Sequence, residues 1–166
     1  MKFLLHISYN LDFKKGCAKG DDKILKIKRK EIIKKDLKSK LSLTVDVVKQ
    51  GSGTTNTGNV ARCFFAEAET VAEITGLNKN LILRLGNILQ ILACGKEIDC
   101  EKFKKYCLDT AELCIHLYPW YKIPPSVHKV LIHGSDIIKH LGLPIGCLSE
   151  EAQEANNKIF RKARAQ

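Results

Sequence analysis

The chain contains no Cys-x-x-Cys pair, although seven of its 166 residues are cysteines. An odd number of cysteines without tight spacing argues against a disulfide framework and predicts buried thiols in a reducing compartment. No apolar run is long enough to cross a bilayer. The apolar run at the N-terminus is interrupted by polar side chains from His6 onward, so we expect neither a secretory signal nor a membrane partner.

Acidic residues are also scarce, because 18 Asp and Glu accompany 28 Lys and Arg and the formal net charge is +10. Twelve basic and only four acidic residues lie between Lys14 and Lys40. A chain this basic is expected to bind a polyanion. The segment itself has two interpretations, a solvated basic helix or a non-specific contact with nucleic acid.

A sustained strand pattern is missing as well, and apolar residues recur at helical spacing, so the predicted fold is mainly α. Asn78 and Asp99 are expected to cap helices, and Thr70 with Glu73 has the spacing of a capping box. The apolar stripe of the basic helix should hold Leu25, Ile32, Ile33 and Leu37. The expected helices cover residues 2–13, about 22–41, 59–68, a turn or two from 70, 79–94, 100–117, 125–141 and a final helix after Ser149. For residues 2–13 a strand is the alternative.

Residues 42–58 include a run of Gly, Ser, Thr and Asn that is typical of turns. The lysine of a nucleotide-binding P-loop is missing there, so a flexible connection is the preferred interpretation. The sequence therefore divides into N-terminal helices with the basic segment (1–41), this linker (42–58), a helical region (59–147) and a C-terminal helix (148–166).

His128 and His133 lie five residues apart in an expected helix. On a straight helix their rings are about 140° apart around the axis, so one Zn²⁺ could bind both only if the helix bends or ends, which Gly134 would permit. Zinc also needs four ligands, and this chain lacks the usual Cys-x-x-Cys contribution. The two residues are either ordinary helix histidines or half of a structural zinc site.

The sequence Gly58-Asn59-Val60-Ala61-Arg62 follows the Thr/Gly-rich run. Free backbone N–H groups at a helix N-terminus favour anions, and side chains that donate there suit DNA phosphates. Asn59 and Arg62 are therefore candidate contacts with the DNA backbone. The alternative is an Asn N-cap beside a solvated Arg.

The aromatic residues Tyr118, Trp120 and Tyr121 surround a proline that ends a helix. They could stack on unpaired bases. A loop held onto the core by its aromatic side chains explains the cluster equally well.

The predicted last helix begins with acidic and ends with basic residues. Glu154 could simply form an i,i+4 pair with Lys158. Small residues on the same helix would let it lie close to a sheet, and Lys158 and Arg161 would then meet a DNA backbone near the carboxylate. Glu151, one turn earlier, is the second choice for that role.

Taken in order, the Gly-Asn-x-Ala-Arg sequence, the Tyr-Pro-Trp-Tyr turn, the His pair and the glutamate helix resemble the terminal part of a Transib-type DDE transposase. That superfamily includes the catalytic subunit of the vertebrate V(D)J recombinase. The resemblance covers roughly Phe3 to Arg164. It implies a helical insertion domain plus the final helix of an RNase H-like core whose strands are missing from this chain.

The resemblance also implies that Glu154 is the third acidic ligand of a two-metal Mg²⁺ or Mn²⁺ centre, and that His128 and His133 derive from a structural zinc site. The first two aspartates are expected upstream of Met1. The chain is thus predicted to be a truncated, catalytically incomplete transposase fragment in the nucleus, with DNA as its partner, no small-molecule substrate, and dimerisation left open. The alternative is an independent basic helical module that binds nucleic acid or a protein.

Overall fold

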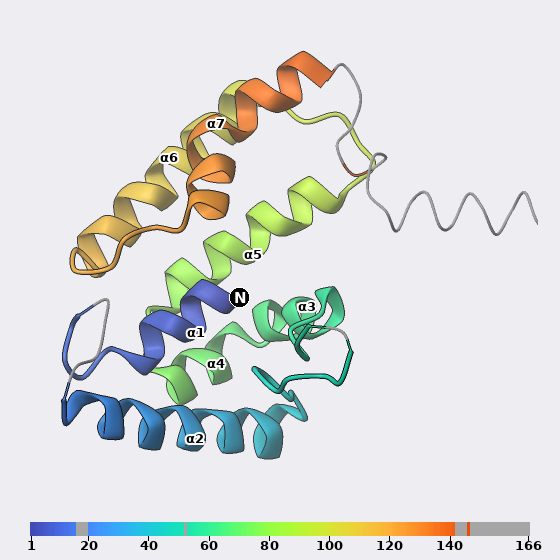
Figure 1. Ribbon diagram of the computed structural model, residues 1–166. Coiled ribbons are helices and arrows are strands. Elements are labelled where there is room, and N and C mark those ends of the chain that lie inside the picture. Colours follow the sequence, from blue (N-terminus) through green and yellow to red (C-terminus); the bar gives the residue numbers. More distant parts are fainter. Residues whose placement is uncertain (16–19, 52, 142–145, 147–166) are drawn as a thin grey trace, which may run out of the picture. The chain divides into compact units, whose positions relative to one another are not determined.

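The computed structural model describes residues 1–15, 20–51, 53–141 and 146, and these are mainly helical, as predicted (Figure 1). Within this part the only extended pairing is an isolated antiparallel bridge between Val48 and Thr54. The helices are α1 (Lys2–Tyr9), α2 (Asp22–Leu41), α3 (Gly58–Ala66), α4 (Ala68–Thr75), α5 (Lys79–Ala93), α6 (Cys100–Leu117) and α7 (Pro125–Leu141).

The chain forms two compact units. Unit 1 is Met1–Gly86 with Glu112–Pro125, and unit 2 is Asn87–Ala111 with Ser126–Gln166. Helices α5 and α6 each run from one unit into the other. In the described part of the chain, none of the helices combines the length and apolar character needed to cross a bilayer.

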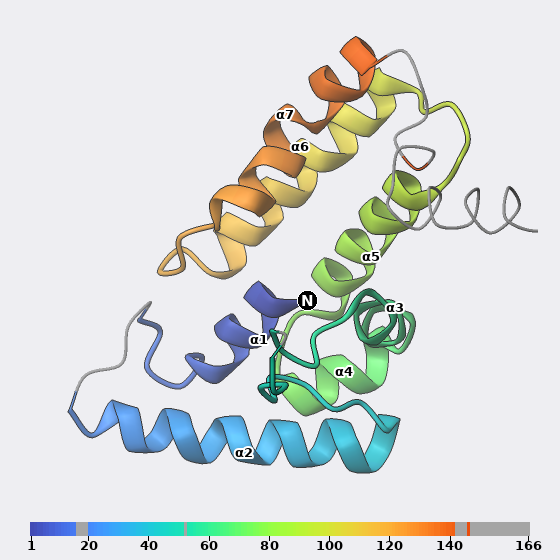
Figure 2. The same ribbon diagram turned by 45° about the vertical axis from the view of Figure 1, so that its right-hand side comes forward.

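Unit 1 is built around three helices, α1, α2 and α4, which pack against one another, while α3 packs against α4 (Figure 2). Burial of aliphatic and aromatic side chains stabilises this arrangement. The fully or almost fully buried residues of its core are Leu4, Leu5, Ile7, Ile33, Leu37, Phe64, Val71 and Leu81.

The buried side of α2 differs from the predicted apolar stripe. Ile33 and Leu37 are buried as expected, but Leu25 and Ile32 are 51% and 60% exposed. The prediction failed because Arg29 lies on the side of α2 that faces α1 and α4, where it binds polar atoms of the backbone. A pattern of apolar residues alone does not reveal a half-buried cation with partners of this kind.

Arg29 links three elements of unit 1. Its Nε donates to the carbonyl oxygen of Ser8 at 2.6 Å, its Nη1 to Asp12 at 2.9 Å, and its Nη2 to the carbonyl oxygen of Thr75 at 3.2 Å. These carbonyls lie at or near the ends of α1 and α4, where helices have backbone acceptors without intrahelical partners. The guanidinium therefore donates hydrogen bonds to backbone carbonyl groups at the ends of two helices.

Two lysines of α2 also face α1. Lys26 donates to Nε2 of His6 at 3.4 Å, and Lys30 lies 5.5 Å from the ring centroid of Tyr9. Burial and the nearby Lys26 lower the pKa of His6, which keeps its ring neutral and able to accept this hydrogen bond. Part of the positive charge of α2 thus holds the fold together.

The Gly/Thr-rich segment after α2 forms a hydrogen-bonded turn. Asp46 donates its N–H to Oδ1 of Asn56 at 3.0 Å and accepts from the side-chain amide of Asn56 at 2.5 Å. The N–H of Thr55 donates to the carbonyl of Val47 at 2.9 Å. Tyr9 donates its hydroxyl to Asp46 at 2.9 Å, which ties the turn to α1. Composition alone did not indicate this ordered pairing.

The predicted helix caps have mixed outcomes. Asn78 and Asp99 cap α5 and α6 as expected, since each side-chain oxygen accepts the backbone N–H three residues later at 3.1 Å. The predicted capping box at Thr70 is wrong because α4 already begins at Ala68. Thr70 consequently lies inside that helix.

In unit 2, α6 and α7 lie side by side in both views (Figures 1 and 2). The hydroxyl of Ser135 donates to the carbonyl of Cys100 at 2.9 Å. Gly134 is buried, and a Cβ at this position would lie in ordinary van der Waals contact with the ring of Phe103, at 3.5 Å. Leu131 and Ile138, also on α7, are buried.

Only two of the five described cysteines are buried thiols. Cys107 and Cys114 are buried as predicted, but Cys63 is exposed and Cys94 and Cys100 are half-buried. All five are free. Burial raises the pKa of the Cys114 thiol to about 11, so this side chain behaves as a small apolar residue rather than a nucleophile.

Candidate nucleic-acid interface

The first turn of α3 holds the two residues of unit 1 that the sequence assigned to DNA. Thr57 is the N-cap, and its hydroxyl accepts the N–H of Val60 at 3.4 Å. Asn59 is therefore not the cap, and that alternative for its role is wrong. Instead, Oδ1 of Asn59 accepts a hydrogen bond from Nη2 of Arg62 at 2.6 Å.

Both Asn59 and Arg62 are exposed. Because the amide holds the guanidinium beside the first turn of α3, a cation lies close to the positive end of the helix dipole. Backbone N–H groups and a guanidinium fork at one place form a suitable environment for a phosphate. This arrangement is the geometric basis for considering nucleic acid as the partner.

The C-terminal part of α2 adds further positive charge. Lys35, Lys38 and Lys40 are exposed, and within the described residues none of the ion pairs involves them. Lys34 differs, because it pairs with Glu31 at 3.5 Å. Figures 1 and 2 both show α3 at the end of unit 1 where α2 ends. The exposed lysines and the start of α3 thus belong to the same end of this unit.

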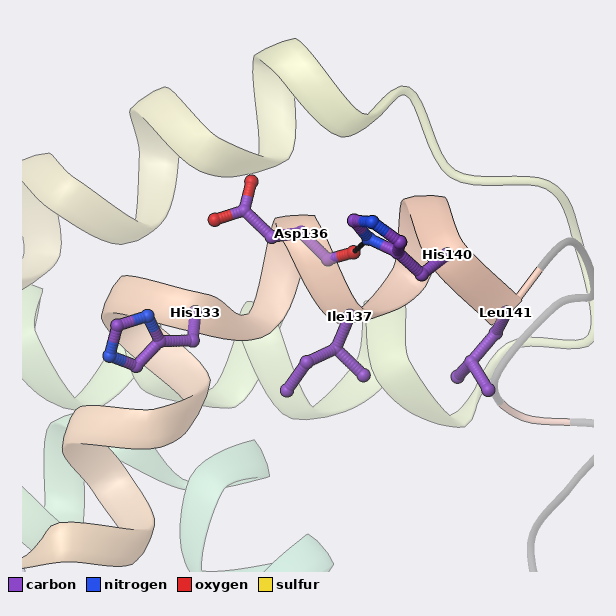
Figure 3. A pocket seen from close by; sticks show the side chains of 5 residues that line it. All are labelled: His133, Asp136, Ile137, His140 and Leu141. Carbon is purple, nitrogen blue, oxygen red and sulfur yellow. Dashed lines mark hydrogen bonds between the residues drawn. The ribbon is translucent and has the colours of Figure 1, made fainter.

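The His pair lies in α7 of unit 2. The ring centroids of His128 and His133 are only 5.3 Å apart, with the ring planes inclined by 64°. The rings meet although α7 extends as one helix from Pro125 to Leu141, so the helix does not end between them. The rings are thus closer than their spacing around a straight helix axis predicted, and the ribbon of α7 changes direction near His133 (Figure 3).

A metal centre needs more than this pair. In the ranges that the structure describes, no group of three or more His, Cys, Asp or Glu side chains is placed to hold a metal ion. Both histidines are exposed, and two imidazoles supply half of the ligands that structural zinc requires. Zinc binding by His128 and His133 stays a prediction for a half-site.

A shallow hollow of about 310 Å³ lies next to this pair (Figure 3). His140 Nδ1 is 2.6 Å from the carbonyl oxygen of Asp136, and the Asp136 carboxylate is 3.7 Å from Lys104. In Figure 3 the Asp136 carboxylate and the His133 ring point in different directions. Ile137 and Leu141 supply the apolar part of the lining. These side chains do not converge on a common point, so the hollow carries no acid–base arrangement.

The aromatic turn is fixed to unit 1. Tyr118 is buried, and its hydroxyl accepts the backbone N–H of Asn78 at 3.0 Å. The Tyr121 hydroxyl is 3.2 Å from Nδ1 of His6. Trp120 packs edge-on against both tyrosines. These contacts favour a loop held onto the core over a platform for stacking bases.

The remaining predicted site residues, Glu154, Lys158 and Arg161, and the second choice Glu151, lie outside the described residues. The expected last helix of an RNase H-like core lies there too. No protein-family model matches this chain, and no curated protein sequence matches it.

Proposed function

We propose that this chain is a DNA-associated part of a Transib-type DDE transposase and is catalytically incomplete by itself. The contact with DNA is made to the phosphate backbone by Asn59 and Arg62 at the start of α3, with Lys35, Lys38 and Lys40 of α2 adding positive charge. One observation carries this proposal: the 2.6 Å hydrogen bond that holds Arg62 on Asn59.

That hydrogen bond supports a binding role for a physical reason. An exposed arginine normally loses much rotamer freedom when it binds a ligand. Because Asn59 already restrains the guanidinium, less freedom is lost when a phosphate binds. The same two residues belong to the Gly-Asn-x-Ala-Arg sequence on which the resemblance rests, so the motif and the geometry support the same role.

The salt dependence of DNA binding tests this proposal. Four phosphate contacts, from Arg62 and the three lysines, predict a slope of about −3.6 in a plot of log Kobs against log salt concentration for a short duplex. Fluorescence anisotropy between 50 and 300 mM KCl would measure it. A binding constant that stays level across this range would rule out phosphate contacts and leave a protein-binding module.

Catalytic incompleteness has a separate test. Two divalent ions need several carboxylate ligands to stabilise both the attacking and the leaving oxygen, and the resemblance supplies only Glu154. With Mg²⁺ or Mn²⁺ we expect no nicking of supercoiled DNA above a buffer control. Nicking that disappears in the Glu154→Gln variant would show that the chain assembles a complete centre. The proposal places the protein in the nucleus, where its DNA substrate lies.

A further inference from the structure

The outward side of α2 exposes an unusual number of large aliphatic side chains. Ile24, Leu25, Ile27 and Ile32 are 56%, 51%, 62% and 60% exposed. Single exposed aliphatic residues are common on protein surfaces, but an adjacent group of them marks an interaction site. These four residues are called the α2 outer patch below, together with Lys28 and Glu31, which lie among them. The Glu31 carboxylate pairs with Lys34 at 3.5 Å.

Helical geometry shows that the outer patch is continuous. At about 100° per residue, its four aliphatic residues fall within an arc of about 160° centred near Lys28, and Ile24, Lys28 and Ile32 form one i, i+4, i+8 row. The buried residues Ile33 and Leu37 lie on the opposite side of the helix. Within unit 1, α2 makes its helix contacts with α1 and α4 through that buried side.

DNA contact does not account for the outer patch. A phosphate backbone offers charge to lysines but no apolar surface that would bury isoleucines. The patch occupies the first half of α2, whereas the lysines assigned to DNA follow it in the second half. The two surfaces are distinct in residues and in chemistry.

The outer patch is also poorly suited to bind a second copy of the chain or a lipid surface. Pairing two copies through α2 would bring together two helices that each hold nine basic and three acidic residues, and like charges repel across an interface. A helix that lies in a bilayer surface exposes apolar residues along its length. In α2 no large aliphatic residue is exposed beyond Ile32, so the apolar surface covers only the first half of the helix.

We propose that the α2 outer patch is the docking site for an acidic polypeptide, namely a helix whose apolar stripe is bordered by Asp and Glu. The aliphatic residues of the patch would bury the stripe, and the exposed Lys23 and Lys28 would face the carboxylates. Ridges at i, i+4 spacing are the surface against which another helix packs. Docking of this partner is independent of the phosphate contacts at α3.

A synthetic probe tests this docking directly. The probe is a helix-forming peptide of about three heptads with Leu at the a and d positions and Glu at the e and g positions. Its control has the same composition in scrambled order, so that charge is constant and only the apolar stripe is lost. Isothermal titration calorimetry with the full chain should show at least tenfold tighter binding of the ordered peptide.

A matched pair of variants locates the docking surface. Ile27→Ser should weaken binding of the ordered peptide about tenfold, whereas Ile115→Ser, at a position 57% exposed on α6, should leave it unchanged. Circular dichroism checks that both variants keep their helix content. Neither substitution should alter DNA binding, and Arg62→Ala should not alter peptide binding, so this inference and the proposed function fail separately.

Several results would overturn the inference. If the ordered and scrambled peptides bind equally well, the attraction comes from charge alone. If neither peptide binds, the outer patch is not a docking site. Equal effects of the two Ile→Ser variants would place the contact elsewhere. Ile27-dependent binding to phosphatidylserine vesicles without peptide binding would identify a lipid surface. Ile27-dependent dimerisation in analytical ultracentrifugation, again without peptide binding, would identify a second copy.

Discussion

Replacing Lys35, Lys38 and Lys40 together by glutamate is expected to weaken binding to a short DNA duplex by about a few hundredfold at 0.1 M salt. Each phosphate contact releases close to 0.9 of a counterion, which is equivalent to about a factor of eight at this salt concentration. Three lost contacts therefore multiply to this value. The slope of log Kobs against log salt concentration should fall in magnitude by about 2.7.

The three positions suit this test because they are exposed and none of them forms an ion pair among the described residues. Their replacement should leave folding intact, since surface substitutions away from specific contacts change stability little. A control with Lys96, Lys129 and Lys139 of unit 2 replaced by glutamate alters net charge equally. If that control weakens binding as much, the effect comes from overall charge, and the assignment to α2 is wrong.

Replacing Arg29 by alanine is expected to lower the free energy of unfolding by about 3 kcal/mol. The substitution removes charged hydrogen bonds to the carbonyl oxygens of Ser8 and Thr75, and a hydrogen bond to a charged group contributes about 1.5–3 kcal/mol. The salt bridge to Asp12 adds less because Asp12 is exposed. The loss should loosen the junction of α1, α2 and α4.

Urea denaturation followed by circular dichroism measures this change. Lys28→Ala, one residue earlier on the outward side of α2, is the matched control and should alter stability by less than about 0.5 kcal/mol. Arg29→Lys should recover only part of the loss, because one ammonium group cannot reproduce the guanidinium fork. Equal stability of Arg29→Ala and Lys28→Ala would show that the three bonds of Arg29 contribute nothing net.

The helices of this chain could be predicted from local features of the sequence, namely apolar periodicity and capping residues. The basic helix was predicted from about Asp22 to Leu41 and has those ends. Asn78 and Asp99 were recognised as caps because a short acceptor side chain at the start of an apolar repeat satisfies free N–H groups. The first helix was placed correctly but ends at Tyr9, earlier than the predicted residue 13.

Within the candidate interface, the sequence singled out Asn59 and Arg62 but could not specify that they bind each other. Their hydrogen bond requires Thr57 to cap α3, so that Asn59 lies inside the first turn with Arg62 one turn later. The aromatic turn left two interpretations open, and the buried hydroxyl of Tyr118 favours a structural role.

The sequence by itself determined that the chain is helical, where most helices begin and end, and that positive charge concentrates on one of them, because capping, periodicity and charge are local properties. Only the tertiary structure decided which side of α2 is buried. Arg29 faces α1 and α4 because two helix ends present backbone carbonyls there, while Leu25 and Ile32 remain exposed. The carbonyl partners of the half-buried Arg29 guanidinium lie 21 and 46 residues away in the sequence, and local sequence patterns carry no information on contacts at that separation.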